Sequence, residues 1–241
     1  MGLFSKTKTV DIFFVGSEGT DLDRGIYAFY FNVDNGEIIK KSFVKSLANP
    51  LAMNKNGRFM YLTYRNGTGR AQDGGIWQYA CMEVQLGLAA RVGNEGRTYI
   101  QTLLNKNSSY AYAIDYYNGE VVTVPIKTSK IIRVSKTVKL DGHSIDPVKQ
   151  TESHPTFMTF TPDNTKLIVT DLGGDEVIFF TEGEKGELIK DEELSFKLTP
   201  GSGPLKLVYS KNRKFAYILN SISSTIACYS VKLNKFTLID E

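Results

Sequence analysis

The side chain with the clearest capacity for chemistry is His154, which stands in a Ser-His-Pro-Thr segment. An imidazole titrates near neutral pH, so it can take a proton from water and act as a general base. Lys206 and Arg65 are cations of the kind that hold phosphate or carboxylate groups, and both stand close to glycines. We predict a catalytic His154, with Lys206 and Arg65 binding substrate at the same mouth of the fold. The alternatives are a loop histidine bonded to the backbone and two solvated cations.

Three more polar residues stand at matching places, each at the end of a strand-like run. Asp115 ends YAYAID, Asp171 ends LIVTD and Asn220 ends AYILN. Side chains at one register of successive strands should point to one rim, so we predict that these three residues also bind substrate. Acidic groups on a rim could instead hold a cation, and more often they cap turns.

Composition excludes several other classes of function. The chain has two histidines, two cysteines and no His-Glu-x-x-His segment, so we predict no metal site and no cofactor. The net charge is +3 without a long basic run, which argues against nucleic acid as a partner. No window approaches the roughly 18 apolar residues of a membrane helix, and the first residues lack the apolar core of a secretion signal. We expect a cytoplasmic protein with no membrane partner.

The elements that must position these residues come from a repeat. Four copies of one pattern recur at intervals of roughly 50 residues, a period typical of propellers and solenoids. Each copy begins with a turn residue and continues into a strand-like run whose end is marked by a second polar or aromatic residue. The turn residues are Asn56, Asn107, Asp163 and Asn212. A second strand follows each time, so we predict stacked four-stranded antiparallel units.

The repeat predicts an all-β propeller over residues 9–241, with residues 1–8 as a flexible leader. About five blades are expected, as part of a seven-bladed ring or as a closed five-bladed ring. An open array would leave sheet edges exposed, so self-association through these edges is expected. The expected partial blade and four full blades cover residues 9–46, 47–96, 97–147, 148–199 and 200–241.

Several segments resemble the seven-bladed β-propeller lactonases, the 6-phosphogluconolactonase family, which is also related to carboxymuconate cyclases. The segments that carry the resemblance are 15–38, 49–65, 149–177 and 200–229. The chain is similar to the first two-thirds of a typical member. The resemblance implies hydrolysis of a sugar lactone of the 6-phosphogluconolactone type, with a sugar lactone or a similar acidic metabolite as partner.

The resemblance also implies a site in the loops at one mouth of the central channel. Where the family pattern has two histidines separated by one residue, this chain has His154 and Thr156. Where the pattern has Arg-His after a Gly-Pro pair, this chain has Leu205 and Lys206, and the family's Asn-Tyr pair begins here with Asp115. These departures favour an alternative, a catalytically degenerate propeller that binds a ligand or a protein.

Overall fold

The computed structural model describes four ranges of the 241-residue chain, which are 10–18, 24–45, 49–68 and 71–241. Antiparallel strands make up the regular structure of these ranges, apart from one 3-10 turn, Glu184–Gly186. No helix in them has the length and apolar character needed to cross a membrane. The leader predicted for residues 1–8 lies outside the described residues.

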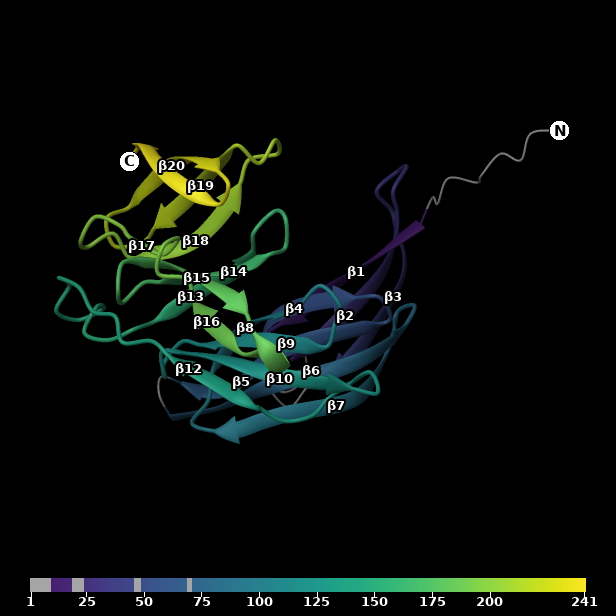
Figure 1. Cartoon of the computed structure of the whole chain (residues 1–241). Coiled ribbons are helices and arrows are strands. Elements are labelled where there is room, and N and C mark those ends of the chain that lie inside the picture. The colour runs from purple at the N-terminus through teal and green to yellow at the C-terminus, as the bar shows by residue number, and fades with distance from the viewer. Residues whose placement is uncertain (1–9, 19–23, 46–48, 69–70) are drawn as a thin grey trace.

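The strands form five antiparallel sheets that follow one another along the chain (Figure 1). The first sheet contains β1 (Val10–Ser17), β2 (Gly25–Asn32) and β3 (Ile38–Lys45). The second contains β4 (Asn49–Asn56), β5 (Phe59–Thr68), β6 (Ala71–Met82) and β7 (Gln85–Glu95). The third contains β8 (Tyr99–Leu104), β9 (Tyr110–Asp115), β10 (Glu120–Lys127), β11 (Lys130–Ile131) and β12 (Lys136–Lys139).

The last two sheets repeat the arrangement. The fourth contains β13 (Pro155–Phe160), β14 (Lys166–Asp171), β15 (Glu176–Glu182), β16 (Leu188–Lys190) and β17 (Phe196–Lys197). The fifth contains β18 (Pro204–Tyr209), β19 (Phe215–Asn220), β20 (Thr225–Lys232) and β21 (Lys235–Asp240). In the third and fourth sheets two short strands share the outer position, because β11 and β12 both pair with β10, and β16 and β17 both pair with β15.

The sheets stack in chain order around an open arc. The inner strands β4, β8, β13 and β18 of consecutive sheets contact one another, and β1 contacts β4. Figure 1 shows the first and last sheets at the two ends of this arc. The predicted all-β array of stacked antiparallel sheets is confirmed.

The turn residues of the sequence repeat form one recurring hairpin. In three copies the side-chain oxygen of the turn residue accepts a hydrogen bond from the backbone N–H two residues later, as in an Asx turn. The distances are 3.1 Å for Asn107 and Ser109, 3.1 Å for Asp163 and Thr165, and 3.0 Å for Asn212 and Lys214. Hydrogen bonds from Thr161 and Thr165 hold the pKa of Asp163 well below its usual range, although its slight burial acts in the opposite direction. The sequence repeat therefore marks the turn that begins the second strand of each unit.

The hydrophobic cores lie between consecutive sheets. Because alternate residues of a strand point to opposite faces, a strand within the array contributes to the core before it and to the core after it. Each of the four cores is formed by residues of two consecutive sheets. Representative pairs, with one residue from each sheet, are Ile26 and Leu62, Tyr61 and Val122, Tyr112 and Val169, and Phe179 and Ile218.

Phe179 tests how much the stability of the array depends on these cores. The side chain is fully buried and its ring lies edge-on to Phe236 of the fifth sheet, with centroids 5.6 Å apart. We expect Phe179→Ala to lower the free energy of unfolding by about 3–5 kcal/mol, because it leaves a cavity between two sheets. Urea denaturation measures this loss, with Ile189→Ala in the exposed part of the same sheet as control. A loss below about 1 kcal/mol, within the range of ordinary surface substitutions, would contradict this description of the core.

Candidate functional site

His154 occupies the position directly before β13, at the end of the fourth sheet where β14 also ends. The residue is buried, with 8% of its surface exposed. Its ring stacks on the ring of Tyr116 from the third sheet, with centroids 4.6 Å apart and planes 13° from parallel. Its Nδ1 lies 3.0 Å from the backbone carbonyl oxygen of Tyr116. One residue of the adjacent sheet therefore fixes both the position and the rotation of the imidazole.

The carbonyl partner decides which nitrogen of His154 carries the proton. A carbonyl oxygen only accepts hydrogen bonds, so Nδ1 must be the donor and must be protonated. In the neutral ring, Nε2 then keeps its lone pair and can accept a proton from water. The contact therefore makes Nε2 the nitrogen that can act as a general base.

Asp171 connects the end of β14 to the loop that carries His154. The residue is fully buried. Its Oδ1 accepts hydrogen bonds from the backbone N–H groups of His154 at 2.7 Å and Gly173 at 3.1 Å, and its Oδ2 accepts one from Ser153 Oγ at 2.8 Å. Burial raises the pKa of Asp171, while these hydrogen bonds favour the charged carboxylate and lower it. The carboxylate therefore positions the backbone of His154.

Ser153, His154 and Asp171 do not form a nucleophilic relay. In such a relay the imidazole lies between the hydroxyl and the carboxylate and accepts the hydroxyl proton. Here the Ser153 hydroxyl donates directly to Asp171, while the imidazole points to Tyr116. The arrangement favours a base that activates water over a serine nucleophile.

Asp115 repeats the position of Asp171 at the end of β9. It is also fully buried. Its Oδ1 lies 3.4 Å from the backbone nitrogen of Thr98 and 3.3 Å from that of Asn118, and its Oδ2 accepts from Asn118 Nδ2 at 2.9 Å. Arg97 pairs with both Asp115, at 3.4 Å, and Glu120. These contacts favour the turn-capping interpretation for Asp115 and, by the same geometry, for Asp171.

Asn220 occupies the third equivalent position, at the end of β19. Its Nδ2 donates to Thr225 Oγ1 at 3.1 Å and to Glu241 Oε1 at 3.2 Å. Its Oδ1 is buried and has no hydrogen-bond partner among the described residues. Of the three predicted rim residues, Asn220 is therefore the one with an acceptor left over for a ligand or a water molecule.

The two predicted cations lie in different surroundings. Lys206 is exposed on β18, and its Nζ lies 5.7 Å from the centre of the Phe157 ring on β13. Arg65 lies near the end of β5 and pairs with Glu18 at 3.3 Å. The structure thus brings Lys206 to the sheet that carries His154 and places Arg65 two sheets away. No hydrogen bond joins His154 to either cation in the described ranges, so the shared mouth stays a prediction.

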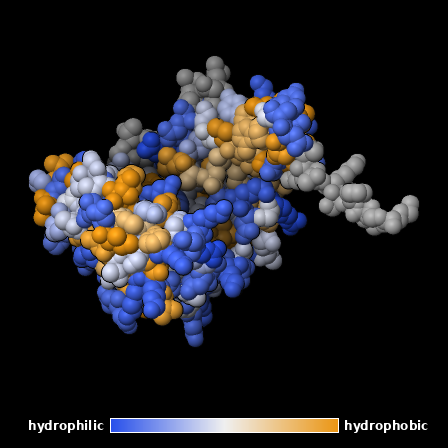
Figure 2. Space-filling model, turned by 90° about the horizontal axis from the view of Figure 1, so that it is seen from above, coloured by the Kyte–Doolittle hydropathy of each residue, from blue (hydrophilic) through white to orange (hydrophobic). Residues whose placement is uncertain are grey.

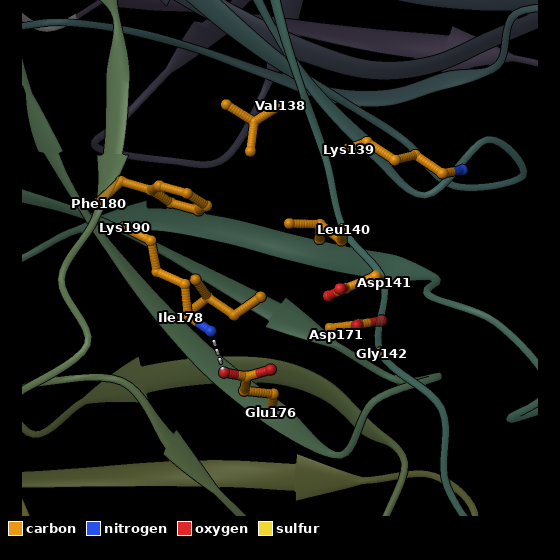
Figure 3. A pocket seen from close by; sticks show the side chains of 10 residues that line it. All are labelled: Val138, Lys139, Leu140, Asp141, Gly142, Asp171, Glu176, Ile178, Phe180 and Lys190. Atoms are coloured by element: carbon orange, nitrogen blue, oxygen red, sulfur yellow. Dashed lines mark ion pairs between the residues drawn. The ribbon is translucent and has the colours of Figure 1, made fainter.

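A cavity of about 90 Å³ adjoins Asp171 (Figure 3). It lies between the segment that follows β12 and the strand β15. Asp141 and Asp171 stand on one side of it, and Glu176 and Lys190 form an ion pair of 3.0 Å on another. The apolar part of the lining consists of Val138, Leu140, Ile178 and Phe180.

Apart from Asp171, the charged residues of this cavity are not among those predicted from the sequence. The sequence does contain a signal for Glu176. Glu176 stands five residues after Asp171, as Glu120 stands five residues after Asp115. In the structure each of these glutamates forms an ion pair with a cation. Carboxylate oxygens accept hydrogen bonds from hydroxyl and ammonium groups, so the cavity suits a polyol or an amine. The described residues contain no cluster of three or more histidine, cysteine or acidic side chains arranged to hold a metal ion.

Stacked antiparallel sheets whose inner strands contact in chain order define a β-propeller, which is the predicted fold class. Comparison with known protein families identifies the family of β-propellers to which the chain belongs. Residues 12–241 match the lactonases with a seven-bladed β-propeller, and the chain belongs to this family.

The relatives are distant and longer. The 6-phosphogluconolactonase of Formosa agariphila is 24% identical over 86% of this chain and 60% of its own length. A protein of Staphylococcus saprophyticus without an assigned function is 22% identical over 94% of this chain and 65% of its own. The chain thus spans about three fifths of the length of the curated relatives it matches.

Solved structures show the same fold. A proposed 6-phosphogluconolactonase from Bacteroides fragilis superimposes with a TM-score of 0.82 at 24% identity, covering 98% of this chain and 68% of that one. The periplasmic gluconolactonase of Pseudomonas aeruginosa gives a TM-score of 0.80 at 18% identity, covering 96% and 67%. At these identities the likeness establishes the architecture of the blades.

Asp171 makes the stability of the site dependent on pH. Its raised pKa means that the folded state binds the proton more tightly, so its contribution to stability is present below about pH 4 and is lost as pH rises through the raised value. We expect Asp171→Asn to lose less stability than the wild type between pH 4 and pH 7. Urea midpoints at the two pH values measure the difference, with the exposed Asp141→Asn as control. Equal pH dependence in wild type and Asp171→Asn would contradict the assignment.

Asp171→Ala tests the positioning contacts separately. This change leaves the N–H groups of His154 and Gly173 without their acceptor in a buried place. We expect the free energy of unfolding to fall by about 1–3 kcal/mol, and by more than in Asp171→Asn, which keeps an oxygen acceptor. An equal loss in the two variants would show that the acceptor is not what holds the loop.

Proposed function

We propose that this protein hydrolyses a sugar lactone of the 6-phosphogluconolactone type, with His154 as the general base. The observation that carries the proposal is the hydrogen bond from Nδ1 to the Tyr116 carbonyl, which leaves Nε2 as the acceptor for a water proton. Membership of the lactonase family and the relatives named 6-phosphogluconolactonase support the choice of reaction.

The proposed reaction begins when His154 Nε2 takes a proton from water. The water oxygen forms a bond to the lactone carbonyl carbon, and the carbonyl oxygen becomes an oxyanion. Collapse of this intermediate breaks the bond between the carbonyl carbon and the ring oxygen. The ring oxygen then takes the proton from the imidazolium, and the product is an open hydroxy acid. Lys206 supplies a positive charge that can hold a phosphate group of the substrate.

A second candidate function is the binding of a ligand or a protein without catalysis. Thr156 donates its hydroxyl to the carbonyl oxygen of Pro204 at 2.8 Å, so this side chain is engaged within the fold. Leu205 is exposed and apolar where the family pattern has an arginine. A site without that arginine retains fewer groups to stabilise an oxyanion, which is the specific reason to keep this alternative.

The base is tested by His154→Gln in an assay of 6-phosphogluconolactone hydrolysis at neutral pH, corrected for spontaneous opening. We expect kcat to fall by about 10²–10⁴-fold, because general base catalysis contributes that much. The matched control is His143→Gln, which replaces the other histidine of the chain, an exposed one. A folded wild type that binds the lactone without opening it would overturn the lactonase proposal in favour of the binding protein.

The role of Lys206 has its own test. Lys206→Ala should raise KM about tenfold for the phosphorylated lactone and leave KM for unphosphorylated gluconolactone unchanged, since an ammonium group recognises the phosphate charge. Lys211→Ala provides the comparison, because it removes an exposed lysine from the turn after the same strand. An equal effect of Lys206→Ala on both lactones would remove Lys206 from phosphate binding.

A further inference from the structure

A second cavity lies between the second and third sheets and has a volume of about 240 Å³. It is found at the ends of the strands opposite to those where Asp115 and His154 stand. Figure 2 shows hydrophilic residues, in blue, and hydrophobic residues, in orange, mixed over the face that it draws. On such a surface a hollow with convergent polar groups indicates a binding site better than single exposed residues do. We call this hollow the Arg58 cavity, after the charged residue in its lining.

The polar groups of the Arg58 cavity are hydrogen-bond donors. Arg58 stands in the turn between β4 and β5, and its guanidinium lies over the Phe59 ring, 5.1 Å from the ring centre. Ser108 and Ser129 reach the cavity from two turns of the third sheet. Ser108 Oγ accepts a hydrogen bond of 2.6 Å from Asn56 Nδ2, so its own hydroxyl hydrogen remains to be donated.

No carboxylate balances the charge of Arg58 in the part of the chain that the structure describes. Neither an aspartate nor a glutamate lines the cavity there, and Arg58 forms no ion pair with a described residue. Lys55 adds a second positive charge, because its Nζ lies 2.8 Å from the carbonyl oxygen of Gly57 in the same turn. A guanidinium binds planar carboxylates through two parallel hydrogen bonds. The cavity therefore suits an anion.

The next junction, between the third and fourth sheets, contains such a carboxylate. Asn105 stands at the end of the inner strand of the third sheet, where its N–H donates to the carbonyl oxygen of Tyr110. Asn56 has the same place in the second sheet and pairs in register with Phe59. Asn105 Nδ2 donates to Glu182 Oε1 of the fourth sheet at 2.8 Å. The chain itself thus supplies a carboxylate to this asparagine.

The Arg58 cavity has the same framework without the carboxylate. Ile126 stands six residues after the start of β10, as Glu182 stands six residues after the start of β15, so an isoleucine takes the place of the glutamate. Tyr61 and Tyr112 are each the third residue of their strand. Burial raises the pKa of Tyr112 and the nearby Glu182 raises it further, whereas Tyr61 lines the cavity. The asparagine and the tyrosine are therefore repeated, and the anion is not.

A buried amide holds the cavity in shape. Gln78 of the second sheet is fully buried. Its Nε2 donates to the carbonyl oxygen of Ser129 at 2.7 Å, and its Oε1 accepts from the backbone N–H of Ile131 at 3.0 Å. Both hydrogen bonds cross to the third sheet, so the hairpin that carries Ser129 is fixed before a ligand arrives. A site that is already formed loses less entropy when it binds.

We propose that the Arg58 cavity binds a small organic acid. The ligand carboxylate meets the guanidinium of Arg58 and the hydroxyl groups of Ser108 and Ser129, and its short apolar body lies against Ile126. The ligand supplies to this junction the carboxylate that Glu182 supplies to the next one. The site is independent of the lactonase reaction proposed for His154, because it lies at the other end of the strands.

Isothermal titration calorimetry with benzoate, a planar carboxylate on a small apolar ring, tests the proposal. Benzoate should bind the wild type saturably, with a Kd of about 1 mM or tighter. Benzamide has the same shape without the charge, and inorganic phosphate has the charge without the planar shape, so each should bind at least about tenfold more weakly at equal ionic strength. Arg58→Gln should weaken benzoate binding at least about tenfold. Arg91→Gln is the matched control, because it removes an exposed arginine of the same sheet outside the cavity, and it should bind like the wild type.

Ile126→Glu provides a second variant, because it places a carboxylate of the chain where Glu182 stands in the next junction. It should abolish benzoate binding, whereas Ile126→Leu should keep it. If circular dichroism shows that Ile126→Glu is unfolded, Ser108→Ala replaces it and should weaken benzoate binding severalfold. A wild type without saturable benzoate binding would overturn the proposal. Equal benzoate affinity in Arg58→Gln and the wild type, or binding of benzamide or phosphate as tight as that of benzoate, would also overturn it.

Discussion

The structure depends on one constraint, which is that a small twisted sheet with two apolar faces cannot stand alone in water. Burial of apolar surface is the main favourable contribution to folding, and each described core lies between two sheets. The order of the sheets in space therefore follows the order of the repeats in the chain. The loops that carry His154 and Asp171 receive their positions from this stacking, because their contacts cross from one sheet to the next or from one strand to its neighbour.

Much of the fold could be predicted from the sequence because the repeat has a local physical cause. Asn107, Asp163 and Asn212 form the same Asx turn, and a turn of this kind depends only on residues close in sequence. The marked residue at the other end of the strand is also recognisable, although its residue type alone is compatible with both substrate binding and turn capping. The outer strands were harder to predict, since in the third and fourth sheets two short strands share one position.

The candidate site was less predictable, because its geometry depends on contacts between residues far apart in the sequence. His154 was recognised by its chemical type, but nothing local indicates that its ring stacks on Tyr116 or that a carbonyl oxygen selects its tautomer. Asp141 and Glu176 were missed, because a cavity between two sheets has no sequence pattern of its own. Lys206 and Arg65 are cations suited to binding an anion, and the sequence identifies them by this residue type. Their positions on different sheets are set by the fold and cannot be read from residue type.

The contact between His154 and Tyr116 has a consequence for how chemical competence is acquired during folding. The imidazole belongs to the fourth sheet and its carbonyl acceptor to the third, so neither sheet alone can set the tautomer. A nascent chain would present an unoriented histidine until these two sheets dock, and would gain a defined proton acceptor only afterwards. The reactivity of the His154 imidazole would then indicate whether the third and fourth sheets have docked.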